Sequence, residues 1–152
     1  MTITVVVAED EALVRAGCVM LLNAAPGVEV LGQAGNGAEA VELARTLRPD
    51  VVLMDLRMPR MDGVTAIRRL APQQRVLVLT TFDADSDVLP AIEAGATGYL
   101  LKDAPRSELY RAVRAAARGE SVLSPVVASR LLRHARADEP VLSAREIEVL
   151  EL

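Results

Sequence analysis

Three carboxylates, one hydroxyl and one ammonium group stand at the ends of short apolar runs. They belong to Glu9, Asp10, Asp55, Thr80 and Lys102. Three carboxylates held close together repel one another and need a cation between them. Oxygen ligands without histidine or cysteine suit a hard divalent ion, and a sparse set completed by water suits Mg²⁺ better than Ca²⁺.

Such a set of groups is suited to phosphoryl transfer. A carboxylate can act as a nucleophile toward phosphorus and form an aspartyl phosphate. Lys102 is the only lysine among seventeen basic residues, and its compact charge can pair one phosphoryl oxygen. The hydroxyl of Thr80 can donate to another. The chemistry that fits is in-line transfer onto Asp55, with Mg²⁺ stabilising the charge.

These side chains converge only if the apolar runs before them form a parallel sheet. Four runs read as strands buried on both faces, and Val28–Ala34 is a further strand candidate; the four are Thr4–Ala8, Val51–Met54, Val76–Leu79 and Gly98–Leu101. The segments between them carry apolar residues at helical spacing, most clearly at 40–47 and 109–116. Five strand–helix units predict an α/β fold, a doubly wound five-stranded parallel sheet of flavodoxin-like order 2-1-3-4-5. The carboxyl ends of its strands would meet at one edge, where ligands bind in such folds.

The composition limits the other classes of function. Apolar residues make up 51% and charged residues 25% of the 152 residues, which is typical of one globular domain with a tail. One cysteine and one histidine cannot build a disulfide framework or a zinc site, and they suit a reducing cytoplasm. No apolar run approaches the ~20 residues of a membrane span. The net charge of −4 includes no basic cluster, so no DNA-binding surface is expected in this stretch.

The organisation of the chain changes near residue 119. Residues 1–119 are expected to form one domain, and residues 120–142 a linker with one helix at 122–132. A capping box begins at Ser143 and predicts another helix start. That helix would be too short to stand alone, so residues 143–152 are interpreted as the start of a second, truncated domain.

Four blocks of sequence resemble the receiver domain of bacterial two-component response regulators, over about residues 3–119. The blocks are Glu9–Asp10, Met54–Gly63, Leu79–Asp83 and Ala94–Asp103. The last two blocks, together with Leu142–Leu150, are similar to the NarL/FixJ subfamily, in which a LuxR-type helix-turn-helix domain follows the receiver. Residues 143–152 would then hold only the first helix of that DNA-binding domain, without its recognition helix.

The resemblance implies roles for the acidic residues. Asp55 would be the phosphoacceptor, taking its phosphoryl group from a sensor histidine kinase. Glu9 and Asp10 would be the acidic pair, with Asp10 closest to Mg²⁺. The backbone carbonyl oxygen of Arg57 would complete the protein ligands.

The resemblance also implies a switch. Thr80 would be the hydroxyl that moves toward the phosphoryl group, and it is preferred over Thr81 because it lies twenty-two positions before Lys102, the spacing that the family keeps. Lys102 would be the paired cation. Tyr99 would be the aromatic residue whose rotamer reports activation.

The implied output is a homodimer that forms on phosphorylation through the first and fifth helices. Candidate residues for its faces are Leu13, Val14, Leu109 and Val113, although the same residues could be core. DNA would be bound only by the C-terminal domain. The chain would act in the cytoplasm as a self-phosphorylating and self-dephosphorylating phosphoacceptor, with no membrane partner and without being a turnover enzyme.

The fourth helix departs from the family pattern because it contains a proline. Pro90 has no amide hydrogen and disfavours helical geometry at Leu89. We expect this helix to begin at Leu89 or Pro90, or to have a distorted first turn. A shortened, mobile fourth helix is the hypothesis for the unphosphorylated state.

Several alternatives compete with these interpretations. Asp10 could simply cap the first helix, and Tyr99 could simply pack in the sheet. A phosphohydrolase with an aspartyl phosphate needs a carboxylate two residues after the nucleophile, where this chain has Arg57. A nucleotide or flavin module needs a glycine-rich phosphate loop after the first strand, where this chain is acidic. The last alternative is a stand-alone or phosphorylation-independent receiver that acts as a protein-interaction module.

Overall fold

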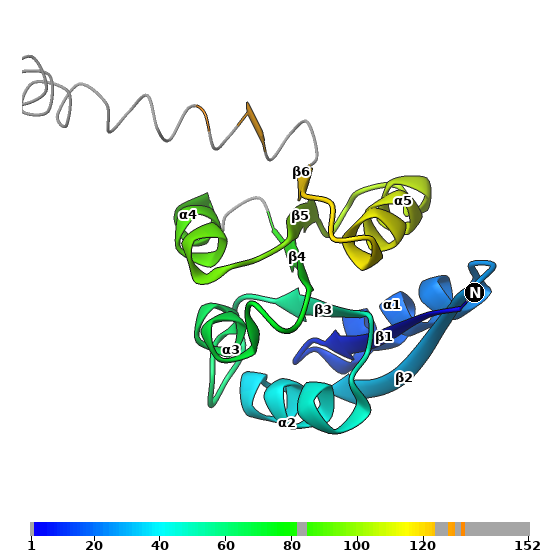
Figure 1. Cartoon of the computed structure of the whole chain (residues 1–152), viewed down its shortest axis with the longest axis horizontal. Helices are drawn as coiled ribbons and strands as arrows, with labels where there is room; N and C mark the ends of the chain where they lie inside the picture. The colour runs from blue at the N-terminus through cyan, green and yellow to red at the C-terminus, as the bar shows by residue number, and fades with distance from the viewer. Residues whose placement is uncertain (1, 82–84, 124–127, 130–131, 133–152) are drawn as a thin grey trace, which may run out of the picture.

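Figure 1 shows the computed structural model of the chain, which describes residues 2–81, 85–123, 128, 129 and 132. Its centre is a parallel sheet of order β2-β1-β3-β4-β5-β6. The strands are β1 (Ile3–Ala8), β2 (Val28–Ala34), β3 (Val51–Asp55), β4 (Val76–Thr80), β5 (Gly98–Leu101) and β6 (Val122–Leu123). The predicted doubly wound sheet, with its order 2-1-3-4-5 over the first five strands, is confirmed.

Helices cover both faces of the sheet (Figure 1). They are α1 (Ala12–Ala24), α2 (Gly37–Leu47), α3 (Gly63–Leu70), α4 (Asp85–Ala94) and α5 (Arg106–Ala117). One hydrophobic cluster lies between the sheet and the pair α1 and α5, and the other lies between the sheet and the helices α2, α3 and α4. Because both faces are covered, the central strands read as continuous apolar runs rather than as alternating ones.

The two faces of each strand follow from the alternation of its side chains. In β3, Val51 and Leu53 pack toward α1 and α5, whereas Val52 and Met54 pack toward α2, α3 and α4. The last residue of β3, Asp55, follows Val51 and Leu53 by the same alternation. Because Asp55 is the last residue of the strand, its carboxylate lies at the carboxyl edge of the sheet, on the side of α1 and α5.

Local sequence signals explain several helix ends. The side chain of Asn36 accepts a hydrogen bond from the Glu39 amide at the start of α2. The side chain of Asp62 accepts one from the Thr65 amide at the start of α3. Both are N-caps, which supply a partner to amides that have none within the helix. At the other end of the domain, α5 is followed by Gly119 at φ 78°, a left-handed conformation that glycine adopts without strain.

The predicted start of the fourth helix is wrong. The helix α4 begins at Asp85 rather than at Leu89 or Pro90, whereas the other option, a distorted first turn, stays a prediction. A proline inside a helix removes one amide donor but does not prevent the helix from continuing. Ala91 of α4 is fully buried in the cluster beneath α2, α3 and α4, and this packing outweighs the local preference.

The predicted helix at 122–132 is wrong at its first two residues. Val122 and Leu123 form β6, which pairs in parallel with Gly98 and Tyr99 of β5 and adds a sixth strand to the expected five. The turn after α5 brings the chain back along the free edge of β5, where a strand gains backbone hydrogen bonds that a helix start would not. The capping box at Ser143 lies outside the described residues, as does the whole of 143–152.

Candidate functional site

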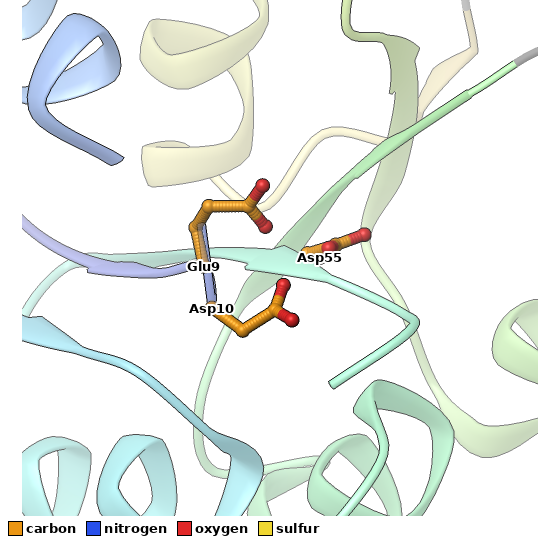
Figure 2. A group of neighbouring side chains, drawn as sticks. All are labelled: Glu9, Asp10 and Asp55. Atoms are coloured by element: carbon orange, nitrogen blue, oxygen red, sulfur yellow. The ribbon is translucent and has the colours of Figure 1, made fainter. Parts of the chain in front are cut away.

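The site lies where β1 and β3, two neighbouring strands, end at the carboxyl edge of the sheet. Ala8 pairs with Met54, so the next residues along the two strands, Glu9 and Asp55, stand beside each other. Asp10 follows in the loop before α1. Carboxylate oxygens of the three residues lie within 4.8 Å of one another, and Figure 2 shows them grouped around one point. The sequence predicts that these three carboxylates converge, and the structure brings them together.

Lys102 joins two of these carboxylates. Its Nζ lies 2.9 Å from Glu9 Oε1 and 3.2 Å from Asp55 Oδ2. The side chains of Glu9 and Asp55 are only 4% and 12% exposed, so these ion pairs are poorly screened by water. Burial alone would lower the pKa of Lys102, but its hydrogen bond to Glu9 and the charge of Asp55 outweigh burial and raise it. The lysine is therefore held as a cation against two carboxylates.

Glu9 is the most perturbed group of the site. Its pKa is raised from 4.5 to about 7: burial contributes most, the hydrogen bond and charge of Asp55 act in the same direction, and Lys102 opposes both. Its second oxygen, Oε2, is buried and has no hydrogen-bond partner among the residues that the structure describes. An acceptor oxygen left without a partner in a buried site costs free energy, and one lysine does not balance three carboxylates. The donor set, which consists of carboxylate oxygens at an open edge, therefore fits a hard divalent cation such as Mg²⁺.

The remaining predicted ligand lies on the loop after β3. Arg57 and Asp10 line one cavity of about 350 Å³, together with Pro59 and Asp62. Asp10 itself is exposed and opens the carboxylate group to solvent on this side. Asp10 is not the cap of α1, because the N-cap position is Glu11, whose own side chain makes no capping hydrogen bond in the described part of the chain. The capping alternative for Asp10 is thus not what the structure shows.

The predicted switch residues lie on the other face of the sheet. Thr80 ends β4, is 2% exposed, and by strand alternation follows Val78 toward α2, α3 and α4. Tyr99 is completely buried in the same cluster. A backbone hydrogen bond joins Thr80 to the lysine, since the Lys102 amide donates to the Thr80 carbonyl oxygen at 2.8 Å. The structure thus connects Thr80 to the site by one backbone hydrogen bond between strand ends.

Two glycines, Gly37 and Gly63, which were not predicted as site residues, shape the loop after Asp55. The amide of Gly63 donates to the Leu56 carbonyl oxygen at 2.8 Å, and the amide of Gly37 donates to that of Met61 at 3.0 Å. A Cβ on either glycine would overlap loop backbone atoms. Glycine allows this close approach of backbone to backbone. In the sequence, Gly37 and Gly63 follow an Asn and an Asp. Such pairs predict turns, but they do not predict close packing of one backbone segment against another.

The metal-free protein is expected to lose stability as pH rises from about 5 to 8. The pKa of Glu9 is about 7 in the folded protein and 4.5 for the free side chain. The folded state therefore keeps a proton that the unfolded state has lost, and this contribution is complete below the unfolded pKa and lost as pH rises through about 7. Its size is at most about 3 kcal/mol in the free energy of unfolding. Urea unfolding in EDTA at several pH values measures it.

The matched variant for this measurement is Glu9→Gln. It removes the titrating group and keeps the side-chain size, so the slope of unfolding free energy against pH should flatten between pH 5 and 7.5. Equal slopes for the wild type and the variant would contradict the assignment of this pH dependence to Glu9.

Comparison with known proteins gives a consistent picture. The family model described as response regulator receiver domain matches residues 5–114. The transcriptional regulatory protein LiaR of Bacillus subtilis is 41% identical over 157 residues, which cover 97% of this chain and 74% of that protein. The probable transcriptional regulatory protein NarL of Mycobacterium tuberculosis is 41% identical over 155 residues, covering 97% of this chain and 72% of that protein.

Solved structures agree with these sequence matches. The crystal structure of the response regulator ChrA, from a haem-sensing two-component system, superposes with a TM-score of 0.78 at 42% identity, covering 99% of this chain and 74% of that one. The receiver domain of NarL from Mycobacterium tuberculosis gives a TM-score of 0.74 at 39% identity, covering 78% of this chain and 98% of that one. Within the described residues, none of the helices has the length and apolar character needed to cross a membrane.

Proposed function

The chain belongs to the response regulator receiver family, with relatives among the LuxR-type two-component regulators, and from this we propose that it accepts a phosphoryl group on Asp55. The observation that carries the proposal is the placement of Lys102 between Glu9 and Asp55, beside Asp10. A structural ion pair would need one carboxylate. This site buries two carboxylates and adds a third, an arrangement that suits cation-assisted phosphoryl transfer.

The chemistry of the step follows from the groups present. An oxygen of the Asp55 carboxylate attacks phosphorus in line with the leaving group, which would be the imidazole of a phosphohistidine on a sensor kinase. A P–O bond forms, the P–N bond breaks, and the imidazole nitrogen takes up a proton. Lys102, already 3.2 Å from Asp55, can pair an oxygen of the transferred group.

The proposed cation is Mg²⁺, held by Glu9, Asp10 and Asp55 with the carbonyl oxygen of Arg57. When bound, it would neutralise the repulsion among the carboxylates and the charge on the phosphoryl oxygens. Glu9 would have to release its proton to serve as a ligand, because only the carboxylate form offers both oxygens. This gives the partnerless Glu9 Oε2 a function in the site.

Phosphorylation would bias the domain between two states. An acyl phosphate adds charge and acceptor oxygens at Asp55, and these compete with Glu9 for Lys102. The shared backbone hydrogen bond ties the end of β4, with Thr80, to Lys102. A shift of Thr80 toward the new phosphoryl oxygens would leave space in the cluster that holds Tyr99, and this would favour a second packing of that side chain.

We also propose that the output is a homodimer that forms on phosphorylation and uses α1. Leu13 and Met20 on this helix are 87% and 74% exposed, and they are apolar side chains without cover in the monomer. The two residues considered for the fifth-helix face, Leu109 and Val113, are 6% and 0% exposed and belong to the core. They are therefore not available to a partner, whereas Leu13 is.

The wider proposal is a regulator that receives its phosphoryl group from a sensor histidine kinase and binds DNA through a C-terminal domain that residues 143–152 would begin. In this proposal the domain is a phosphoacceptor and not a turnover enzyme, as its relatives' names as transcriptional regulators suggest. The alternative is a receiver that acts as a protein-interaction module without phosphorylation.

Intact-protein mass spectrometry separates these alternatives. The wild-type protein is incubated with phosphoramidate, in Mg²⁺ or in EDTA. We expect the mass of one phosphoryl group to be added in Mg²⁺ and none in EDTA, and we expect the adduct to be lost on treatment with hydroxylamine, as an acyl phosphate is. A Mg²⁺-independent adduct, or one stable to hydroxylamine, would place the chemistry elsewhere.

A further inference from the structure

Arg15 on α1 contacts the backbone that carries the acidic pair. Its Nη1 donates a hydrogen bond of 2.7 Å to the carbonyl oxygen of Glu9, in a partly buried position. The Glu9 amide donates to the Ala34 carbonyl oxygen of β2 at 2.9 Å. Both backbone polar groups of Glu9 are thus held, one by the sheet and the other by a helix side chain.

The charge of Arg15 is not used in an ion pair within the described part of the chain. Its guanidinium makes its hydrogen bond to a neutral carbonyl, although three carboxylates lie on the same segment and on the neighbouring strand. Charge attraction alone would favour a carboxylate partner. The observed geometry instead anchors the peptide unit between Glu9 and Asp10, from which both carboxylates project.

We propose that Arg15 is a positioning residue for the divalent-cation site, holding the Glu9–Asp10 peptide so that both carboxylates face Asp55. This inference rests on the function proposed above. The groups behind metal ligands commonly set ligand orientation, and their loss typically weakens metal binding 10- to 100-fold. Arg15 acts on the backbone rather than on a ligand side chain.

The sign of the effect distinguishes this role from a purely electrostatic one. A guanidinium near the site repels a second cation, so removal of its charge alone would tighten Mg²⁺ binding. Removal of a positioning hydrogen bond would weaken it. The substitution Arg15→Met removes both the charge and the donor while keeping an extended side chain, and the two roles predict opposite changes in Kd.

The test is Mg²⁺ binding to the unphosphorylated protein by isothermal titration calorimetry. We expect Arg15→Met to raise the Kd about 10-fold or more. Arg15→Lys, which keeps a donor and the charge, should recover part of that loss. In phosphoramidate reactions, the Mg²⁺ concentration for half-maximal rate should rise in parallel, while the rate at saturating Mg²⁺ stays within about twofold of wild type.

A matched control is available on α5. The Tyr110 hydroxyl donates to the Leu21 carbonyl oxygen at 2.7 Å, so Tyr110→Phe also removes a side-chain donor from a backbone carbonyl, but from one in the second half of α1 and not from the Glu9 carbonyl. Its Kd for Mg²⁺ should equal that of the wild type. If Arg15→Met does not fold, Arg15→Gln, whose shorter amide cannot span the distance, replaces it.

Three outcomes would overturn the inference. One is an unchanged or lower Kd in Arg15→Met or Arg15→Gln, and another is an equal weakening in Tyr110→Phe. The third is a wild-type protein that binds no Mg²⁺, which would also overturn the proposed function. The wild type is measured in the same series. If the wild type binds Mg²⁺ and the Arg15 variants bind it equally well, only the positioning role of Arg15 is overturned.

Discussion

Asp55→Asn is expected to abolish the phosphoryl adduct completely. The amide keeps the size and much of the hydrogen bonding of the carboxylate but has no anionic oxygen to attack phosphorus. Other residues of the site stabilise charge and cannot replace the nucleophile, so the loss should exceed the 10²- to 10³-fold that removal of a single charge-stabilising donor typically causes. Intact-protein mass after incubation with phosphoramidate and Mg²⁺ measures it.

The control for this variant is Asp62→Asn. Asp62 lies on the same loop, where its side chain caps α3 by accepting a hydrogen bond from the Thr65 amide at 2.8 Å. Asparagine caps helices about as well as aspartate, so the fold and the adduct should both persist. An adduct that survives in Asp55→Asn, or one that disappears in Asp62→Asn with the fold intact, would move the phosphoacceptor away from Asp55.

The variant Asp55→Asn also reports on the electrostatics of the site. Burial raises the pKa of Glu9 most, and Asp55 contributes to the rise both through its side chain's hydrogen bonding and through its charge. Without that second carboxylate, the pKa of Glu9 should fall below about 7. Carboxyl ¹³C chemical shifts of Glu9 against pH would show this change in a folded protein that cannot be phosphorylated.

The edge that carries the site could be predicted from the sequence because it follows from topology. Polar residues that end apolar runs must lie at the carboxyl edge of a parallel sheet, whichever helices surround it. For Glu9, Asp55 and Lys102, the run that precedes each residue contained the necessary information. These residues are far apart in the chain, but the parallel pairing of their strands brings the strand ends close together in space.

What the sequence did not reveal depends on contacts between segments that are distant in the chain. The buried, partnerless oxygen of Glu9 results from how closely Lys102 and Asp55 approach it, and no local pattern encodes that distance. The start of α4 at Asp85 is decided by packing against the core and not by the proline. β6 forms because the edge of β5 is open to pairing, which depends on where α5 ends.

The second prediction with a large effect concerns Gly63→Ala. A Cβ at this position would lie 2.5 Å from the Asp55 carbonyl oxygen and 2.6 Å from the Leu56 Cα. Both are backbone atoms, so relief requires movement of the chain that follows β3 rather than rotation of a side chain. Overpacking of this kind typically costs 1–3 kcal/mol, and backbone contacts this short place the expected loss near the top of that range, at about 3 kcal/mol of unfolding free energy.

The loss would have a functional consequence as well as a structural one. Since the displaced atoms belong to Asp55 and the residue after it, the nucleophile itself would move relative to Lys102. Small misplacements of reacting groups lower rates strongly. We therefore expect Gly63→Ala to slow phosphorylation by phosphoramidate even under conditions in which the variant is fully folded, as measured by circular dichroism and by mass.

Gly17→Ala supplies a control of opposite sign. Gly17 lies within α1, and a Cβ there would have no atom within 4 Å. Alanine in a helix interior is more stable than glycine by roughly 0.5–1 kcal/mol, so this variant should be more stable than the wild type. The urea concentration at the unfolding midpoint should therefore be highest for Gly17→Ala, intermediate for the wild type and lowest for Gly63→Ala. A midpoint for Gly63→Ala equal to that of the wild type would mean that the loop after Asp55 can move freely, and the close packing against α3 would then have no part in positioning the nucleophile.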